Sequence, residues 1–349
     1  MSAIRVDLFS DTKTRPSAAM RAVMAVAEVG DERAGEDPAV NALEERGAAL
    51  LGKEAALYLP SGTMCNEIAL AVHCRPGEAV LCEAGAHIVG FEAGGAGALA
   101  GVMLEPIAGT RGMFSAAQLR AQLRADNLQA PLQRLVSVEH TTNLGGGAIW
   151  PLHELRAVAE AAHAANLATH MDGARLFNAV VAGGVSAADF AQGYDSVWVD
   201  FSKGLGAPGG ALLAGTRTFV RDARRWQLRI GGAMRQSGII AAACSFALDQ
   251  HLPLLAQDHA RARRLADGIA QLPGVRIDAA AVETNLVYFE ITAPHWDAAR
   301  LAAATLAHGV RLCPMGPRRV RAVTHLDVDD AGIELALAVL GEVLAGPPR

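Results

Sequence analysis

Residues 195–208 read DSVWVDFSKGLGAP, an apolar run followed by a glycine-rich turn that contains one lysine. We predict a strand over Ser196–Phe201, and Lys203 comes just after it. In parallel α/β sheets, ligands bind at the carboxyl ends of the strands. Partial removal from water favours the free amine of a lysine, which is the form that makes imines with carbonyl groups. A lysine in a surface turn is the alternative, and this segment alone does not separate the two.

The segments on either side place this stretch within a larger sheet. From about residue 55 to 245, short apolar runs alternate with segments of helical period, which is typical of a mainly parallel sheet covered by helices. Apolar residues at spacings of three and four predict an amphipathic helix that follows Pro151. The predicted strands of this region are Ala79–Cys82, Leu135–Val138, Ala168–Met171, Ser196–Phe201 and Ala211–Ala214.

The pattern restarts after a long helix-compatible region near Ala241–Leu272. Alternating apolar residues predict strands over Leu286–Glu290 and Val320–Thr324. Segments of helical period predict helices over Asp297–His308 and Asp330–Leu344. This second set of elements is expected to form a smaller α+β layer of its own.

The two patterns predict an α/β protein of two domains. The large domain, residues 1–245, carries the mainly parallel sheet and an N-terminal arm, and the small α+β domain covers residues 246–349. The chain has 349 residues, 51% of them hydrophobic, which suffices for two buried cores at roughly 100–200 residues a domain. No flexible linker is visible, so we expect the domains to pack rigidly and share a cleft.

Composition disfavours several classes of protein. The net charge of −5, with both signs interspersed, gives no reason to bind nucleic acid, which requires concentrated positive charge. No stretch approaches the ~20 continuous apolar residues of a membrane span, and the N-terminus lacks the pattern of a secretory signal. The five cysteines contain no C-x-x-C pair, which argues against a disulfide framework and a zinc site. We therefore expect a cytoplasmic protein that binds no nucleic acid, no membrane and no metal.

A carboxylate follows a second predicted strand. The segment HMDGAR, residues 170–175, puts Asp172 at the end of the strand Ala168–Met171. A carboxylate there can keep a pyridine nitrogen protonated, and a protonated ring is the stronger electron sink. A helix N-cap is the alternative role for Asp172. Because Lys203 stands at a matching strand end, the cofactor role is favoured, and the cofactor would be pyridoxal 5′-phosphate (PLP).

Two further segments suit the remaining parts of such a cofactor. Gly62 and Thr63 precede an amphipathic run and would open a helix whose free backbone N–H groups suit a phosphate. His87 lies beyond the next strand, where its flat ring could stack on a pyridine face. Each signal is weak alone, since many helices start this way and a lone histidine is usually structural.

The order of the motifs along the chain is more specific. The segments SDTKTRP (residues 10–16), SGT, FEAGG, HMDGARLFNA, SKGLGAP, MRQSG and VTHLD occur in the order found in low-specificity L-threonine aldolases. The sequence resembles this family over nearly its whole length. The resemblance implies an aspartate-aminotransferase-type fold (fold type I), PLP as cofactor, and usually a homotetramer with active sites between neighbouring subunits.

The same resemblance implies roles for individual residues. Lys203, His87 and Asp172 would be catalytic, as the imine-forming lysine, the stacking ring and the partner of the pyridine nitrogen. The implied cofactor ligands are Gly62, Thr63, His87, Asp172, Arg175, Lys203 and Arg235, the last from a neighbouring subunit. Ser10, Arg175 and Arg321 would bind the substrate carboxylate, a task that suits planar guanidinium groups. Either arginine alone could equally belong to a surface ion pair.

The chain departs from the family pattern at two places. The family commonly reads ENTHN where this chain has EHTTN, so Thr142 stands in place of the histidine thought to face the substrate hydroxyl. His140 and Thr142 are both expected at the substrate, and His140 would compensate if its ring turns inward. Because His140 stands two residues nearer the strand, an opposite-facing, structural role is the alternative. A family tyrosine is replaced by Ala34, which is expected to leave room for a large β-substituent.

The resemblance implies cleavage of a β-hydroxy-α-amino acid, such as L-threonine, L-allo-threonine or phenylserine, to glycine and an aldehyde. An amino-acid racemase, a transaminase or a β-eliminating lyase of the same fold is the alternative. A nucleotide-binding or purely structural α/β protein is disfavoured, because neither glycine segment matches a G-x-G-x-x-G or P-loop fingerprint.

Overall fold

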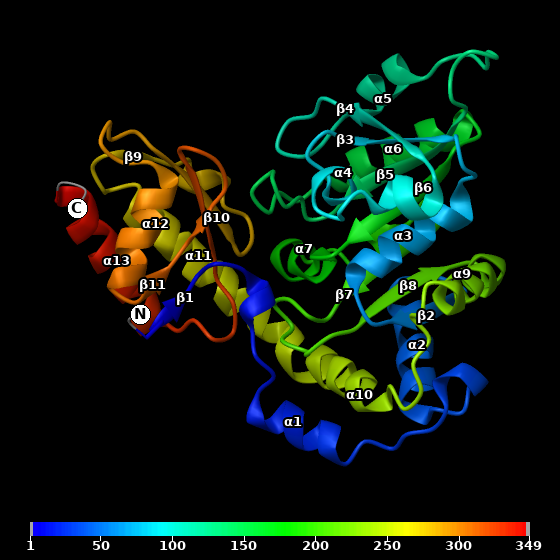
Figure 1. Cartoon of the computed structure of the whole chain (residues 1–349), viewed down its shortest axis with the longest axis horizontal. Helices are drawn as coiled ribbons and strands as arrows, with labels where there is room; N and C mark the ends of the chain where they lie inside the picture. Colours follow the sequence, from blue (N-terminus) through cyan, green and yellow to red (C-terminus); the bar gives the residue numbers. More distant parts are fainter. Residues whose placement is uncertain (1–2, 347–349) are drawn as a thin grey trace.

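The computed structural model describes residues 3–346, which form a larger and a smaller body around two main sheets, together with a third sheet of only two strands (Figure 1). The larger sheet has seven strands in the order β2-β8-β7-β6-β5-β3-β4, and the smaller has four in the order β12-β13-β10-β9. The strands are β1 (Val6–Asp7), β2 (Ala55–Leu59), β3 (Ala79–Glu83), β4 (Met103–Ile107), β5 (Gln133–Glu139), β6 (Ala168–Gly173), β7 (Ser196–Asp200), β8 (Ala211–Gly215), β9 (Val275–Arg276), β10 (Leu286–Ile291), β11 (Val310–Arg311), β12 (Cys313–Pro314) and β13 (Arg319–Val323).

The large sheet is mainly parallel, as the sequence predicts. Strands β7, β6, β5, β3 and β4 run parallel to one another, and β8 pairs antiparallel with both β7 and β2. All five predicted strands of this region are confirmed. The two edge strands, β2 and β4, escaped prediction. The sequence of β4, MLEPI, mixes a charge and a proline with apolar residues and leaves Met103 exposed.

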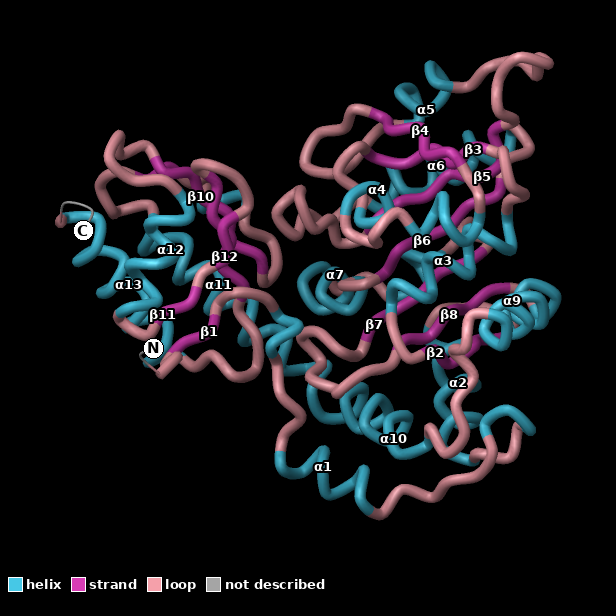
Figure 2. Tube along the Cα trace, in the orientation of Figure 1, coloured by secondary structure: helices cyan, strands magenta, loops and turns pink. Residues whose placement is uncertain are grey.

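Helices connect the strands and cover the sheet, as the cyan segments of Figure 2 show. Their bounds are α1 (Ala18–Ala25), α2 (Pro38–Leu50), α3 (Gly62–His73), α4 (His87–Gly90), α5 (Ala116–Gln122), α6 (Leu152–Ala164), α7 (Leu176–Gly183), α8 (Ala187–Ala191), α9 (Arg217–Arg229), α10 (Gly238–Phe246), α11 (Leu255–Ile269), α12 (Ala298–Ala307) and α13 (Asp330–Ala345). The helix predicted after Pro151 is α6, and it buries Leu155, Val158 and Ala162 against the sheet. The spacing of the apolar residues therefore identified the face of α6 that packs against the sheet.

The smaller body contains the predicted C-terminal strands and helices, which are confirmed as β10, β13, α12 and α13. The start of the chain also joins this body. Strand β1 pairs in parallel with β11, and Val6 and Leu8 belong to the same buried cluster as Phe289 and Leu340. The sequence-based division had placed this arm with residues 1–245, because a two-residue strand carries no periodic signal. We propose a domain boundary near residue 245, with the N-terminal strand added to the second domain.

One continuous helical stretch, Gly238–Ile269, links the two bodies. By length and mean composition alone it is apolar enough to cross a membrane, although charged residues such as Asp249 and Asp258 interrupt it, so it is no continuous apolar run. The core helix of a folded protein passes the same test, and this stretch packs like a core helix. Its α10 contacts α1 and α2, while its α11 contacts α7, α13 and β10. About two fifths of its most apolar window, 39%, is buried by these contacts.

Leu8 offers a test of whether the N-terminal strand belongs to the second core. Its side chain is fully buried, so we expect Leu8→Ala to lower the free energy of unfolding by about 2–5 kcal/mol through lost burial and a cavity. Urea unfolding followed by circular dichroism measures the change. The control is Ile4→Ala, whose side chain is 47% exposed and should change stability by less than about 0.5 kcal/mol. Equal effects of the two substitutions would contradict the packing of β1.

Candidate active site

A cavity of about 430 Å³ lies at the carboxyl ends of β6 and β7 and is lined by residues of both bodies. Its wall combines residues from the N-terminal arm, the large sheet and β13. Eight of the residues predicted from the sequence line it, namely Ser10, Gly62, Thr63, His87, Asp172, Arg175, Lys203 and Arg321. This is where the topology of a parallel sheet puts a ligand.

Lys203 stands in the turn that follows β7, with 18% of its side chain exposed. Its Nζ donates to Asp200 Oδ2 at 2.5 Å and lies 5.5 Å from the centre of the Trp198 ring. The turn closes through Gly206, whose φ of +72° favours glycine, and a Cβ there would meet Thr14 at 3.1 Å. The amine is thus held at the cavity by a carboxylate that the sequence analysis did not single out.

Asp172 is the last residue but one of β6 and is almost completely buried. Its Oδ2 accepts from Asn66 Nδ2 at 2.8 Å, and its Oδ1 accepts from the backbone N–H of Ala174 at 3.0 Å. Burial raises the pKa of Asp172, against the opposing effects of nearby His87, Asn66 and Lys203. A cationic group placed against this carboxylate would therefore be strongly favoured.

Asn66 sits behind Asp172 and connects it to other polar groups. Its amide nitrogen also donates to Glu92 Oε1 at 2.7 Å. Its amide oxygen accepts from Trp198 Nε1 at 2.7 Å and lies 3.1 Å from His170 Nε2. Asn66 is buried on α3, four residues after Gly62, and nothing in the sequence distinguished it from an ordinary helix residue.

His87 begins α4 at the cavity wall. Its ring Nδ1 is 2.7 Å from Glu92 Oε1, and its backbone N–H donates to Glu139 Oε2 at 2.8 Å. Burial lowers the pKa of His87, but the hydrogen bond to Glu92 and the surrounding carboxylates outweigh burial and raise it. The ring stacks on Phe91 with 5.5 Å between centroids. The hydrogen bonds at Nδ1 and at the backbone N–H hold the histidine in place, so its flat ring could stack on a planar ligand.

The N-terminus of α3 opens into the same cavity. The Ser61 side chain caps the helix by accepting from the backbone N–H of Met64, which leaves earlier N–H groups free for an anion. Gly62 is required for this packing, because a Cβ would meet the Trp198 ring at 2.2 Å. The helix end is therefore fixed directly against β7 and can hold a phosphate.

A buried ion pair joins the N-terminal arm to the end of β6. Arg175 donates from Nε to Asp11 Oδ2 at 2.7 Å and from Nη2 to Asp11 Oδ1 at 2.8 Å. Asn285 of the smaller body donates to the same carboxylate at 3.0 Å. Burial would raise the pKa of Asp11, but the charge and hydrogen bonds of Arg175 outweigh it and hold that pKa well below its ordinary value. The guanidinium is thus fixed at the cavity with one nitrogen, Nη1, outside the pair.

Arg321 projects from β13 into the cavity. Its Nη1 donates to Asn143 Oδ1 at 3.0 Å and its Nη2 to the backbone carbonyl of Phe9 at 3.2 Å. Its Nε is buried and has no hydrogen-bond partner among residues 3–346. An unpaired buried donor is costly, so an anionic ligand would be bound here. Ser10 lies nearby and accepts from Thr12 Oγ1 at 3.0 Å.

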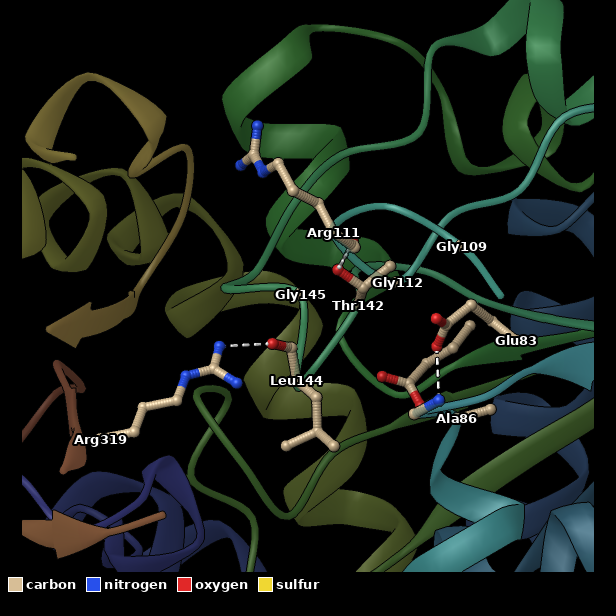
Figure 3. A pocket seen from close by; sticks show the side chains of 11 residues that line it. Glu83, Ala86, Gly109, Arg111, Gly112, Thr142, Leu144, Gly145 and Arg319 are labelled. Atoms are coloured by element: carbon tan, nitrogen blue, oxygen red, sulfur yellow. Dashed lines mark hydrogen bonds between the residues drawn. The ribbon is translucent and has the colours of Figure 1, made fainter. Parts of the chain in front are cut away.

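The structure does not bring His140 or Thr142 to this cavity. Glu139 faces it, so the next residue of the strand, His140, points to the opposite face and packs on Phe190. Burial lowers the pKa of His140 to about 3, which keeps the ring neutral. Thr142 lines a second cavity of about 350 Å³, where its hydroxyl donates to the Arg111 carbonyl (Figure 3). Neither residue therefore lines the cavity that holds Lys203 and Asp172, and for His140 the structure agrees with the alternative, structural role.

Arg235 and Ala34 also lie outside the cavity, on one patch of surface. Arg235 is exposed and its Nη1 pairs with Asp31 at 2.9 Å. The backbone N–H of Glu32 donates to the Arg235 carbonyl, which ties this loop to the turn containing Ala34. Neither residue can act at the cavity of its own chain in this position.

The donors around the cavity match the parts of PLP. The amine of Lys203 suits its aldehyde, and the buried acid Asp172 suits its pyridine nitrogen. The flat ring of His87 suits the face of the pyridine ring, and the N-terminus of α3 suits the phosphate. The unpaired Nε of Arg321 and the Nη1 of Arg175, which lies outside the ion pair with Asp11, could bind a carboxylate beside PLP. The residues present therefore fit PLP together with an amino acid.

Comparisons with known proteins agree with this geometry. A family model described as beta-eliminating lyase matches residues 7–292. The low specificity L-threonine aldolase of Escherichia coli K12 is 41% identical over 324 residues, covering 93% of this chain and 94% of that protein. Low-specificity L-threonine aldolase 1 of Arabidopsis thaliana is 37% identical, covering 97% and 96%. Alanine racemase TOXG of Cochliobolus carbonum is 32% identical, covering 99% and 89%.

Two solved structures show the same fold at lower identity. The threonine aldolase of Leishmania major superposes with a TM-score of 0.81 at 19% identity, covering 97% of this chain and 99% of that one. Serine palmitoyltransferase of Sphingomonas wittichii gives 0.76 at 15% identity, covering 100% and 93%. The fold is that of the aspartate-aminotransferase-type PLP enzymes. On the family match and the identities above, the chain belongs to the low-specificity L-threonine aldolase family of PLP-dependent lyases.

Proposed function

We propose that the protein cleaves L-threonine, L-allo-threonine and related β-hydroxy-α-amino acids to glycine and an aldehyde. The observation that carries this function is the meeting of Lys203, Asp172 and two arginines in one cavity. The amine and the buried acid suit PLP, and the arginines suit the carboxylate of an amino acid. The retro-aldol reaction is the chemistry of the family to which the chain belongs.

Each residue has a task that its position supports. When bound, PLP supplies a protonated ring that accepts the electron pair released at Cα. Asp172 keeps the proton on the ring nitrogen, and His87 stacks on the ring. Arg175, Arg321 and Ser10 hold the substrate carboxylate, so that the Cα–Cβ bond is the one aligned for cleavage. Lys203 carries the amine that exchanges with substrate, and Gly62 and Thr63 bind the phosphate.

Racemisation is the second candidate, because one relative is named an alanine racemase. A racemase would use the same lysine and acid but would break the bond from Cα to hydrogen. Incubation with L-alanine and with L-threonine separates the two activities. D-alanine formation without aldehyde release would favour the racemase.

We propose that the chain works in the cytoplasm as a homotetramer with shared sites. The support is the surface patch of Arg235 and Ala34, which both lie away from their own cavity. Arg235 would release Asp31 and bind the phosphate held by a neighbouring subunit. Ala34 would then lie beside the neighbour's substrate.

Replacing Lys203 tests the central assignment. We expect Lys203→Ala to abolish aldehyde release from threonine while the circular dichroism spectrum stays unchanged, since the phosphate and ring contacts come from other residues. Visible absorbance of the purified protein should shift with borohydride in the wild type and not in the variant. The control is Lys13→Ala, an exposed lysine that should leave turnover unchanged. Normal aldehyde release by a folded Lys203→Ala protein would refute the assignment.

Mixed oligomers test whether sites are shared. Lys203→Ala and Arg235→Ala chains should each be inactive or nearly so. If Arg235 serves a neighbour's site, a dimer of one Lys203→Ala chain and one Arg235→Ala chain contains two different sites. One site carries both substitutions, and the other carries neither. Random reassembly should then restore about one quarter of wild-type activity. No recovery, with mixed assemblies confirmed by mass spectrometry, would show that Arg235 does not serve a neighbour.

The last prediction concerns the substrate's side chain. The small side chain of Ala34 should leave apolar volume near the β-carbon, so phenylserine should be favoured over threonine by about ten- to thirty-fold in kcat/KM, from ~25 cal/mol per Å² buried. Ala34→Tyr should remove most of that preference. Ala125→Tyr, at an exposed position in the loop that follows α5, is the control. Equal losses on both substrates in Ala34→Tyr would show that residue 34 does not line the substrate site.

A further inference from the structure

The proposed reaction needs a group that removes the β-hydroxyl proton, and Thr142 replaces the histidine expected there. We propose that Glu139 is this base. The proposal rests on the proposed function, and it concerns a residue to which neither the motif nor the comparisons assign a role in catalysis.

Glu139 is positioned at the meeting point of the two cavities. It ends β5, is 6% exposed, and lines both the cofactor cavity and the cavity of Figure 3. Its Oε2 accepts from the backbone N–H of His87, and its Oε1 accepts from that of Asn143. Residue 87 carries the stacking ring, and residue 143 orients Arg321. The carboxylate is therefore fixed between the ring site and the carboxylate site, where the β-carbon of a bound amino acid would lie.

The surroundings of Glu139 suit a base that works near neutral pH. Burial, followed by the charge of Asp172, raises its pKa to about 7, against the backbone hydrogen bonds and His87. A base whose pKa lies near the working pH is the most effective. The titratable and charged groups that face it are His87, Asp172, Cys82 and Arg175, with Glu83, Arg111 and Arg319 across the second cavity.

The other polar groups of the cofactor cavity are less suited. Arg175 and Arg321 are permanent donors. Asp172 and Lys203 are assigned to the cofactor, and Asp200 is paired with Lys203. His87 is hydrogen-bonded to Glu92, which raises its pKa, so the ring carries a proton for more of the time and accepts one less readily. Glu139 is the remaining acceptor whose carboxylate is bonded only by neutral backbone N–H groups.

The step balances without an added reagent. The O–H bond of the substrate breaks, its proton passes to a Glu139 oxygen, and its electron pair forms the C=O bond of the aldehyde. The Cα–Cβ bond breaks at the same time. Cα then gains one proton to give glycine, which equals the one removed from oxygen.

Two reactions of the same holoenzyme separate a base from a structural residue. Glu139→Gln should lower kcat for threonine cleavage by about 10²-fold or more. Exchange of the glycine α-proton with deuterium, followed by NMR, involves no β-hydroxyl and should stay within about threefold of wild type. In the wild type, kcat should rise with pH up to about 7, because only the ionised carboxylate accepts a proton, and the variant should lose this dependence.

Glu83→Gln is the matched control. Glu83 ends the neighbouring strand β3, accepts the backbone N–H of Gly85 at 2.6 Å, and lines only the cavity of Figure 3. Its kcat and pH profile should match the wild type. Cleavage by Glu139→Gln within threefold of wild type would overturn the proposal, and so would a parallel loss of cleavage and glycine exchange, which would mark Glu139 as structural. A wild-type protein that exchanges glycine but releases no aldehyde would contradict the proposed function itself.

Discussion

The buried ion pair between Asp11 and Arg175 is the contact on which the site depends. It joins the N-terminal arm to the end of β6, and Asn285 ties the smaller body to the same carboxylate. Removing two charges from water costs several kcal/mol per ion, so the pair is maintained by its bidentate geometry and the added hydrogen bond. Loss of either partner would leave the charge of the other unpaired, where the N-terminal arm, the end of β6 and the smaller body meet. The pair thus fixes both the domain junction and the guanidinium that we assign to the substrate.

A second polar network holds the cofactor side of the cavity. Asn66 links Asp172 to Glu92, and Glu92 in turn orients the ring of His87. Asn66 also accepts from Trp198, whose ring packs against Gly62 at the start of α3. The acid, the stacking ring and the helix end therefore belong to one rigid unit. Such support is what keeps reacting groups within the narrow geometry that catalysis requires.

The sequence identified the residues that follow the strands, because strand ends are marked by a change from apolar runs to glycine and charge. Lys203 and Asp172 were found in this way, and the parallel sheet brings them to one cavity. Glu139 ends a strand in the same way but was passed over in favour of His140 and Thr142. Side-chain direction alternates along a strand, so one position decides whether a group faces the cavity or the core. Which of the two, Glu139 or His140, faces the cavity is known only once the packing of β5 is known.

The sequence by itself determined the α/β class, the main strands and helices, the family and eight of the residues that line the cavity, since these follow from local periodicity and from motifs of contiguous residues. The tertiary structure decided what depends on contacts between distant segments. It placed β1 beside β11, paired Asp11 with Arg175, and put Asn66 behind Asp172. It also separated Arg235 from the cavity of its own chain. These contacts join residues far apart in the chain, and local sequence patterns carry no information about which distant groups will meet.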